Sequence, residues 1–211
     1  MSVLIGMLLS SLSSGASIIC APGFQAPRFF EWLSELQPTW YSAGPSIHHS
    51  VIARAATLPG LPPGLRLRFI KSASAPLSLT AMAELESIFG VPVVEAYGMT
   101  EASSQLATNP LPPAARKPGA VGVATGAEIA IADDEGAPAP QGARGEIIVR
   151  GPSITLGYAD NPEANAACFR DGWLRTGDQG YLDEDGYLFI TGRLKEQINR
   201  AGEKISPREI D

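Results

Sequence analysis

The chain has 211 residues, of which 45% are hydrophobic and 18% are charged, and its formal net charge is −6. This composition is typical of a folded protein long enough for one large domain or two small ones. The sequence has no basic run and no stripe of alternating aromatic and basic residues, which excludes a nucleic-acid-binding surface of the usual kind. Cys20 and Cys168 stand far apart in no metal-ligand spacing, so we expect a reducing compartment, the cytoplasm.

The apolar stretch over residues 1–20 matches neither a signal peptide nor a membrane span. No Lys or Arg precedes Arg28, and serines interrupt the stretch before it reaches the ~20 residues that a span needs. The pattern predicts instead a buried helix over 3–12, a helix C-cap region at Gly15 and a core strand over 17–21.

Helical and strand patterns alternate over the next eighty residues. Helices are predicted over 27–36, 45–56 and 78–89, and strands over 39–43, 67–72 and 93–97. The first and third of these helices each have one apolar face, made of Phe29, Phe30, Leu33 and Leu36 and of Leu79, Met82, Leu85 and Phe89. This alternation is typical of an α/β fold with a mostly parallel sheet and helices packed on it.

The composition shifts at a proline-rich loop that begins near Pro110. Short strands are predicted beyond it, over 128–132, 146–150 and 187–191, with hairpin turns over 133–136 and 183–186. We interpret this part as a small β-barrel or twisted sheet. Residues 198–202 predict a strand and loop, and a capping box with proline at the first helical position predicts a helix that begins at Ser206.

The predicted organisation has three parts. A parallel-sheet α/β subdomain covers 1–118, a β-barrel subdomain covers 119–192, and a hinge with the truncated start of a C-terminal α+β domain covers 193–211. Because the last predicted helix begins five residues before the chain stops, we expect the chain to be an internal piece of a larger protein.

The most informative run is Val-Glu-Ala-Tyr-Gly-Met-Thr-Glu over residues 94–101, directly after a predicted strand. The Tyr97 ring is able to stack on a nucleobase, the Thr100 hydroxyl to bind a phosphate oxygen, and the Glu101 carboxylate to serve as a hard ligand for Mg²⁺. The alternative is a strand that ends in an ordinary turn, since such segments commonly carry Gly and Thr.

Within this run, Tyr-Gly-Met-Thr-Glu resembles the adenine- and phosphate-binding motif of the adenylate-forming (AMP-binding) superfamily. That superfamily includes acyl-CoA synthetases, luciferases and the adenylation domains of peptide synthetases. Gly-Trp-Leu-Arg-Thr-Gly-Asp-Gln-Gly-Tyr over 172–181 and Gly-Tyr-Leu-Phe-Ile-Thr-Gly-Arg-Leu-Lys-Glu-Gln-Ile-Asn over 186–199 resemble further family motifs, in the family's order and spacing. The resemblance implies a ligase that uses ATP, Mg²⁺ and a small carboxylic acid to form an acyl-adenylate and then transfers the acyl group to coenzyme A.

The resemblance also implies the nucleotide site. Asp178 accepts hydrogen bonds from both ribose hydroxyls, and Arg193 contacts ribose or phosphate; the alternatives are a turn aspartate and a surface arginine. A small-residue loop over 72–77 lets backbone approach the nucleotide, although small residues also suit a tight turn. With Tyr97 on adenine, Thr100 on the α-phosphate and Glu101 on Mg²⁺, the remaining implied nucleotide-binding residues are Ala75, Glu95, Ala96, Gly98, Met99 and Thr108.

Lys195 stands where the family places the hinge about which its C-terminal domain swings between half-reactions. The loop implied to meet the adenylate and coenzyme A contains Asn199, Ala201, Gly202 and Lys204. His48 has two interpretations: a structural residue at a helix start, or a substrate-pocket residue that pairs with the second carboxylate of a dicarboxylic acid.

Two family elements do not occur in the sequence: a Ser/Thr/Gly-rich phosphate loop, expected before Met1, and a catalytic lysine, expected beyond Asp211. We therefore expect the isolated chain to be inactive without the missing parts of its parent. The favoured function is an acid–CoA ligase similar to the oxalate–CoA ligase-like group. A peptide-synthetase adenylation domain is a second possibility, disfavoured by Met99 and Lys195, and a non-catalytic nucleotide-binding remnant is a third.

Overall fold

The computed structural model describes residues 2–133, 135–194, 198–200 and 203–205. The chain divides into two compact units. The first comprises Val3–Tyr97 and Asn109–Gly119, and the second comprises Gly98–Thr108 and Ala120–Asp211.

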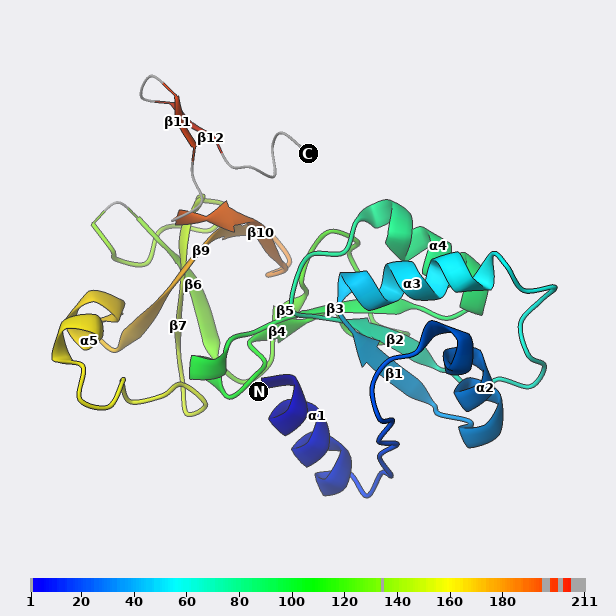
Figure 1. Ribbon diagram of the computed structural model, residues 1–211. Helices are drawn as coiled ribbons and strands as arrows, with labels where there is room; N and C mark the ends of the chain where they lie inside the picture. The colour runs from blue at the N-terminus through cyan, green and yellow to red at the C-terminus, as the bar shows by residue number, and fades with distance from the viewer. Residues whose placement is uncertain (1, 134, 195–197, 201–202, 206–211) are drawn as a thin grey trace. The chain divides into compact units, whose positions relative to one another are not determined.

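The first unit is an α/β layer structure. Its elements are α1 (Ser2–Ser13), α2 (Ala26–Leu36), β1 (Trp40–Ala43), α3 (Pro45–Ala55), β2 (Phe69–Ser72), α4 (Leu79–Phe89) and β3 (Val93–Tyr97). Strands β1, β2 and β3 pair in parallel in that order. Helices α3 and α4 lie side by side along these strands (Figure 1). The predicted parallel sheet with packed helices is therefore confirmed.

One apolar core holds the helices of this unit to its sheet. Phe30 of α2 stacks on Phe89 of α4 with ring centroids 6.1 Å apart, and the fully buried Ile70 of β2 belongs to the same cluster. Helix α4 begins at a Ser78 cap, whose hydroxyl accepts a hydrogen bond from the Ala81 N–H at 3.2 Å. The Ser78 cap thus sets the start of the helix, and the predicted apolar periodicity sets its packed face.

Several predictions for the first unit are wrong. Helix α1 forms and turns at Gly15 as predicted, but Leu9 and Leu12 are 59% and 58% exposed. Residues 17–21 form no strand and are exposed. Because the α1 sequence is apolar without a distinct polar face, it does not show which side of the helix packs against the rest of the unit. Leu36 and Leu79 are also exposed, because each is the terminal residue of its helix rather than part of the packed middle turns.

The second unit is mainly antiparallel. It contains the 3₁₀ turn η1 (Thr100–Ala102), β4 (Ala107–Thr108), β5 (Val123–Ala124), β6 (Glu128–Ala132), β7 (Gly145–Arg150), α5 (Pro162–Cys168), β8 (Phe169–Arg170), β9 (Trp173–Leu182), β10 (Leu188–Arg193), β11 (Ile198–Arg200) and β12 (Glu203–Ile205). Its main sheet has the order β10-β9-β7-β6, with β8 paired to β9. Strands β9 and β10 run antiparallel and lie next to each other in Figure 1.

The predicted strands over 128–132, 146–150 and 187–191 correspond to β6, β7 and β10. Strand β9 was not predicted, because Gly177 and Gly180 break its alternation and are typical of turns. The strand predicted after 198 forms as β11, and the helix predicted from Ser206 lies outside the described residues. Over the part of the chain that is described, no helix combines the length and apolarity needed to cross a membrane.

Candidate functional site

The carboxyl ends of β1, β2 and β3 align in the first unit. Ala43 pairs with Ser72, and Ser72 pairs with Glu95. Ser72 and Glu95 are both buried polar residues, and the Ser72 hydroxyl has no hydrogen-bond partner among the described residues. Open α/β sheets bind ligands outside the carboxyl ends of their strands. The row of polar residues therefore lies where a ligand site is expected.

The small-residue loop over 72–77 leaves β2 at this edge. Ser74 has φ +78°, in the left-handed region that a non-glycine residue rarely adopts. Such conformations cost about 1–3 kcal/mol and cluster at ligand-binding segments. Ala75, the implied nucleotide contact, follows directly and is exposed. The loop therefore presents backbone and small side chains rather than a bulky group.

His48 lies in the first turn of α3, after β1, and is fully buried. Its Nδ1 lies 3.5 Å from the Tyr41 hydroxyl, and its Nε2 makes no hydrogen bond within the described part of the chain. Burial lowers the pKa of His48 to about 4, although the nearby carbonyls of Ala43 and Lys71 oppose the shift. The imidazole is therefore neutral at neutral pH, and its chemistry is that of a hydrogen-bonding group rather than of a cation.

The implied adenine and phosphate residues follow β3. Tyr97 ends that strand and is 9% exposed. At Gly98, a Cβ would lie 1.7 Å from the Ser104 carbonyl oxygen, so the site admits only glycine. Thr100 begins η1 and is exposed. The tight Gly98 turn thus fixes the backbone from which Thr100 and Glu101 project.

Glu101 is held in place by a distant part of the second unit. Its Oε1 accepts a hydrogen bond from the Tyr158 hydroxyl at 2.9 Å, and its carbonyl accepts one from the Thr155 N–H at 2.7 Å. Burial, reinforced by the Glu101 carboxylate, raises the pKa of Tyr158 to about 12, so the phenol stays protonated and donates. Tyr158 was not predicted, because no local pattern links residues 57 positions apart.

The donor set around Glu101 fits Mg²⁺ bound together with a phosphorylated ligand. Mg²⁺ commonly takes one or two carboxylates and completes its shell with waters and substrate phosphates. The described residues contain no group of three His, Cys, Asp or Glu side chains able to hold a metal alone. A cation at Glu101 would accordingly need oxygen ligands from the nucleotide.

Asp178 and Arg193 come together in the second unit. They face each other in the β9–β10 ladder, and Arg193 Nε donates to Asp178 Oδ1 at 2.9 Å. Asp178 is 6% exposed, whereas Arg193 is exposed. The ion pair orients a buried carboxylate, and a carboxylate held in one orientation is a suitable acceptor for a vicinal diol.

The other residues implied by the resemblance lie in β4, in β11 and β12, or outside the described part of the chain. Thr108 lies in β4 and pairs with Val123 of β5. Asn199 of β11 pairs with Lys204 of β12 in an antiparallel ladder. Lys195, Ala201 and Gly202 lie outside the described residues.

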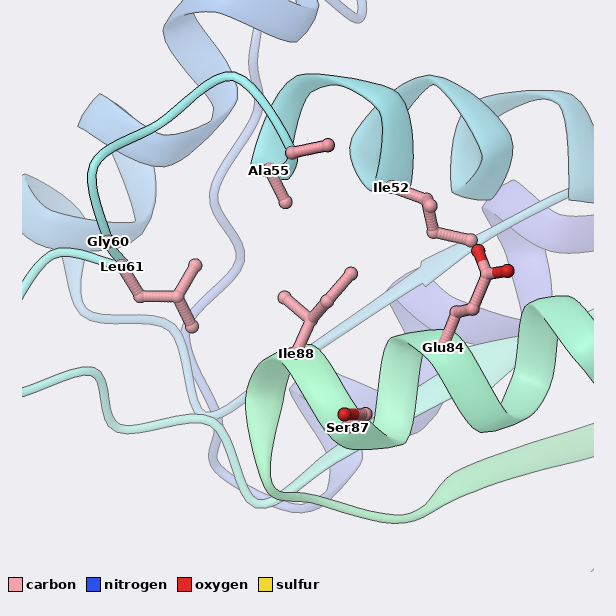
Figure 2. A pocket seen from close by; sticks show the side chains of 8 residues that line it. Ile52, Ala55, Gly60, Leu61, Glu84, Ser87 and Ile88 are labelled. Atoms are coloured by element: carbon pink, nitrogen blue, oxygen red, sulfur yellow. The ribbon is translucent and has the colours of Figure 1, made fainter.

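A cavity of about 370 Å³ lies elsewhere in the first unit, between α3, the following loop and α4 (Figure 2). Its lining is mainly aliphatic, and the Glu84 carboxylate lies beside Ile52 at one end (Figure 2). None of the implied nucleotide or substrate residues lines it. A nucleotide requires polar and charged partners, so this aliphatic cavity is not a candidate nucleotide site.

Sequence comparison gives close relatives over almost the whole chain. The family model for AMP-binding enzymes matches residues 1–159. The probable CoA ligase CCL9 of Humulus lupulus is 49% identical over 99% of this chain and 40% of its own length. The oxalate–CoA ligase of Arabidopsis thaliana is 47% identical over 99% of this chain and 41% of its own length. The chain thus spans about two fifths of these relatives.

Comparison with solved structures gives the same family. O-succinylbenzoate coenzyme A synthetase of Bacillus subtilis, solved in complex with ATP and magnesium ion, superposes with a TM-score of 0.85 at 30% identity, over 99% of this chain and 43% of that one. The chain therefore belongs to the AMP-binding family of acyl-CoA ligases.

Proposed function

We propose that the chain is part of an ATP-dependent acid–CoA ligase. Such an enzyme first joins the carboxylate of an acid to the α-phosphate of ATP with release of pyrophosphate, and then transfers the acyl group to the thiol of coenzyme A with release of AMP. The observation that carries the proposal is the buried Asp178 carboxylate oriented by Arg193. The relatives support the reaction type, because the protein from Arabidopsis thaliana is an oxalate–CoA ligase.

The nucleotide is bound by residues with complementary chemistry. Asp178 accepts hydrogen bonds from the ribose hydroxyls, and Tyr97 stacks on adenine, with the backbone of Ala75, Glu95, Ala96, Gly98 and Met99 beside it. Thr100 binds the α-phosphate, and Arg193 contacts ribose or phosphate. Thr108 completes the site. These contacts position the α-phosphate for attack by the acid, and positioning is the main source of rate in phosphoryl chemistry.

Glu101 would hold Mg²⁺, which neutralises phosphate charge when bound. Tyr158 fixes Oε1 of Glu101 and so sets the direction in which the carboxylate presents its ligand atoms. In the second half-reaction, Lys195 is the proposed hinge. The loop that contains Asn199, Ala201, Gly202 and Lys204 approaches the adenylate and coenzyme A.

The proposed substrate is a small carboxylic acid. His48 is the proposed pocket residue, and its neutral imidazole offers a single hydrogen bond to a polar group on the acid rather than a charge. Oxalate is the first acid to test, because an oxalate–CoA ligase is 47% identical to the chain.

The alternative is a non-catalytic remnant that binds nucleotide without reaction. The chain spans about two fifths of its relatives, and we propose that it is inactive alone. A chimera distinguishes the two: residues 1–211 replace the matching 41% of the Arabidopsis thaliana oxalate–CoA ligase.

The chimera and the isolated chain are assayed for acyl-CoA formation with oxalate and a panel of small mono- and dicarboxylic acids. Ligase function predicts ATP- and acid-dependent thioester from the chimera and none from the isolated chain. A folded chimera that binds ATP but makes no thioester with any acid would favour the remnant.

A further inference from the structure

Strand β9 carries a bulge at the residues before and including Asp178. In the β7–β9 ladder, Ile148 pairs with Arg175 and Glu146 pairs with Gln179. Between these pairs, Ile147 alone stands opposite three residues of β9: Thr176, Gly177 and Asp178. Gly177 has φ +75°, which lets the chain loop out of the ladder. Bulges redirect side chains near functional sites, and this one sets the direction of Asp178.

Glu146, on the neighbouring strand, accepts hydrogen bonds from the residue before the bulge and from the centre of the bulge. Its Oε1 accepts a hydrogen bond from the Gly177 N–H at 3.0 Å, and its Oε2 accepts one from Arg175 Nε at 2.7 Å. Arg175 Nη2 also contacts Oε2. One carboxylate thus joins the last ladder residue before the bulge to the central residue of the bulge.

A second set of contacts completes the geometry. The Thr176 hydroxyl donates to the Ile147 carbonyl at 2.8 Å and accepts a hydrogen bond from the Asp178 N–H at 3.1 Å. The backbone of Asp178 is therefore fixed through Thr176, and that of Gly177 through Glu146. Losing either support would free the bulge to return toward regular ladder pairing.

The Glu146 side chain is much more buried than that of its partner Arg175. The side chain of Glu146 is only 8% exposed, whereas that of Arg175 is 42% exposed. Burying a carboxylate costs free energy unless the charge is paired and hydrogen-bonded, so a buried glutamate is a poor way to gain stability. The arrangement is better explained by orientation, since a carboxylate is able to hold an N–H and a guanidinium at once.

We propose that Glu146 is a positioning residue for nucleotide binding: it holds the Thr176–Gly177–Asp178 bulge so that the Asp178 carboxylate meets the ribose hydroxyls. The inference rests on the proposed function, because it assigns the ribose to Asp178. It adds a residue that lies outside the motif and touches no ligand itself.

The test compares the 211-residue chain with Glu146→Ala and Glu146→Gln. The glutamine keeps a carbonyl acceptor for Gly177 but not the charge. It therefore provides a folded variant to measure if Glu146→Ala does not fold. Glu128→Ala is the matched control, because Glu128 pairs with Arg150 across β6 and β7 and contacts no residue of the bulge. Circular dichroism verifies that each variant is folded.

The first measurement is amide hydrogen exchange at Gly177 and Asp178 by NMR. Exchange is expected to accelerate about tenfold or more in Glu146→Ala, less in Glu146→Gln and not in Glu128→Ala, as expected for the loss of a hydrogen bond to a charged group. Unchanged exchange in a folded Glu146→Ala chain would overturn the inference.

The second measurement is the ratio of the dissociation constants for 2′-deoxy-AMP and AMP, because general destabilisation does not change this ratio. The chain is expected to prefer AMP, Asp178→Ala to lose the preference, and Glu146→Ala to lose most of it. If Glu146→Ala keeps the preference for AMP and Asp178→Ala loses it, the positioning role of Glu146 is wrong, whereas the assignment of the ribose to Asp178 stands. Equal binding of both nucleotides by the unaltered chain would overturn the ribose assignment of Asp178 and with it the proposed site.

Discussion

The Tyr158 hydroxyl donates a hydrogen bond to Oε1 of Glu101 across 2.9 Å, although the two residues lie 57 positions apart in the chain. The pair lies within the second unit, and the Thr155 N–H, three residues before Tyr158, donates to the Glu101 carbonyl. The loop around 153–158 thus fixes both the backbone and the side chain of the proposed Mg²⁺ ligand.

Tyr158→Phe removes one neutral donor to a carboxylate and leaves the ring in place. In the oxalate–CoA ligase chimera, we expect the Mg²⁺ concentration for half-maximal activity to rise about three- to tenfold, which corresponds to the net value of roughly 1 kcal/mol for one hydrogen bond. Mn²⁺ binding in the presence of ATP provides a readout independent of turnover.

Tyr181→Phe is the control, because Tyr181 stacks on Phe189 in the same unit and loses the same hydroxyl. An equal shift in both variants, or none in Tyr158→Phe, would mean that the Tyr158 contact does not orient a metal ligand.

His48 makes the stability of the chain depend on pH. Its pKa is about 4 in the folded chain, because of burial, against 6.5 when unfolded. Between these values the unfolded chain binds more protons, so stability falls as the pH falls from 6.5 toward 4, by about 3 kcal/mol in total. Urea unfolding at several pH values across this window measures the slope.

His48→Gln should flatten that slope whatever it does to stability at pH 7. His49→Gln is the matched control, since His49 is the neighbouring residue and is exposed. A slope that His48→Gln leaves unchanged would show that His48 titrates normally.

Much of the fold follows from local patterns. Strand β3 has the predicted bounds 93–97, because the β-branched Val93 and Val94 favour an extended backbone and Gly98 lets the chain turn away after Tyr97. Helix α4 follows from Ser78 and the spacing of Met82 and Leu85. The strand predicted over 17–21 does not form, because a short apolar run does not reveal whether a neighbouring strand is available to pair with it.

The candidate site was predictable only where its residues lie in motifs. Asp178 and Arg193 were each assigned from their motifs, whereas their ion pair depends on the register of β9 against β10. Glu146 and Tyr158 contact motif residues from distant segments. No spacing in the sequence encodes such contacts, which arise only after the strands have paired.

Lys195→Pro tests the proposed hinge in the same chimera. Proline fixes φ near −65° and removes a backbone donor, so a hinge that rotates between half-reactions would lose one of its two conformations. We expect ATP–pyrophosphate exchange to persist within about tenfold and thioester formation to fall much further. Lys195→Ala, which keeps the backbone free, is the control. Equal loss of both activities in Lys195→Pro would assign the residue to chemistry or folding instead.

Acid-dependent ATP–pyrophosphate exchange by the chimera shows whether Asp178 binds the ribose of ATP in an acid–CoA ligase. Asp171→Ala is the control, because the Asp171 side chain is 89% exposed in the same unit. Two hydrogen bonds to a charged acceptor are together worth about 3 kcal/mol or more, so Asp178→Ala should lower kcat/KM for ATP at least about a hundredfold. Exchange by the Asp178→Ala chimera at the rate of the Asp171→Ala control, with unchanged KM for ATP, would show that Asp178 does not bind the ribose.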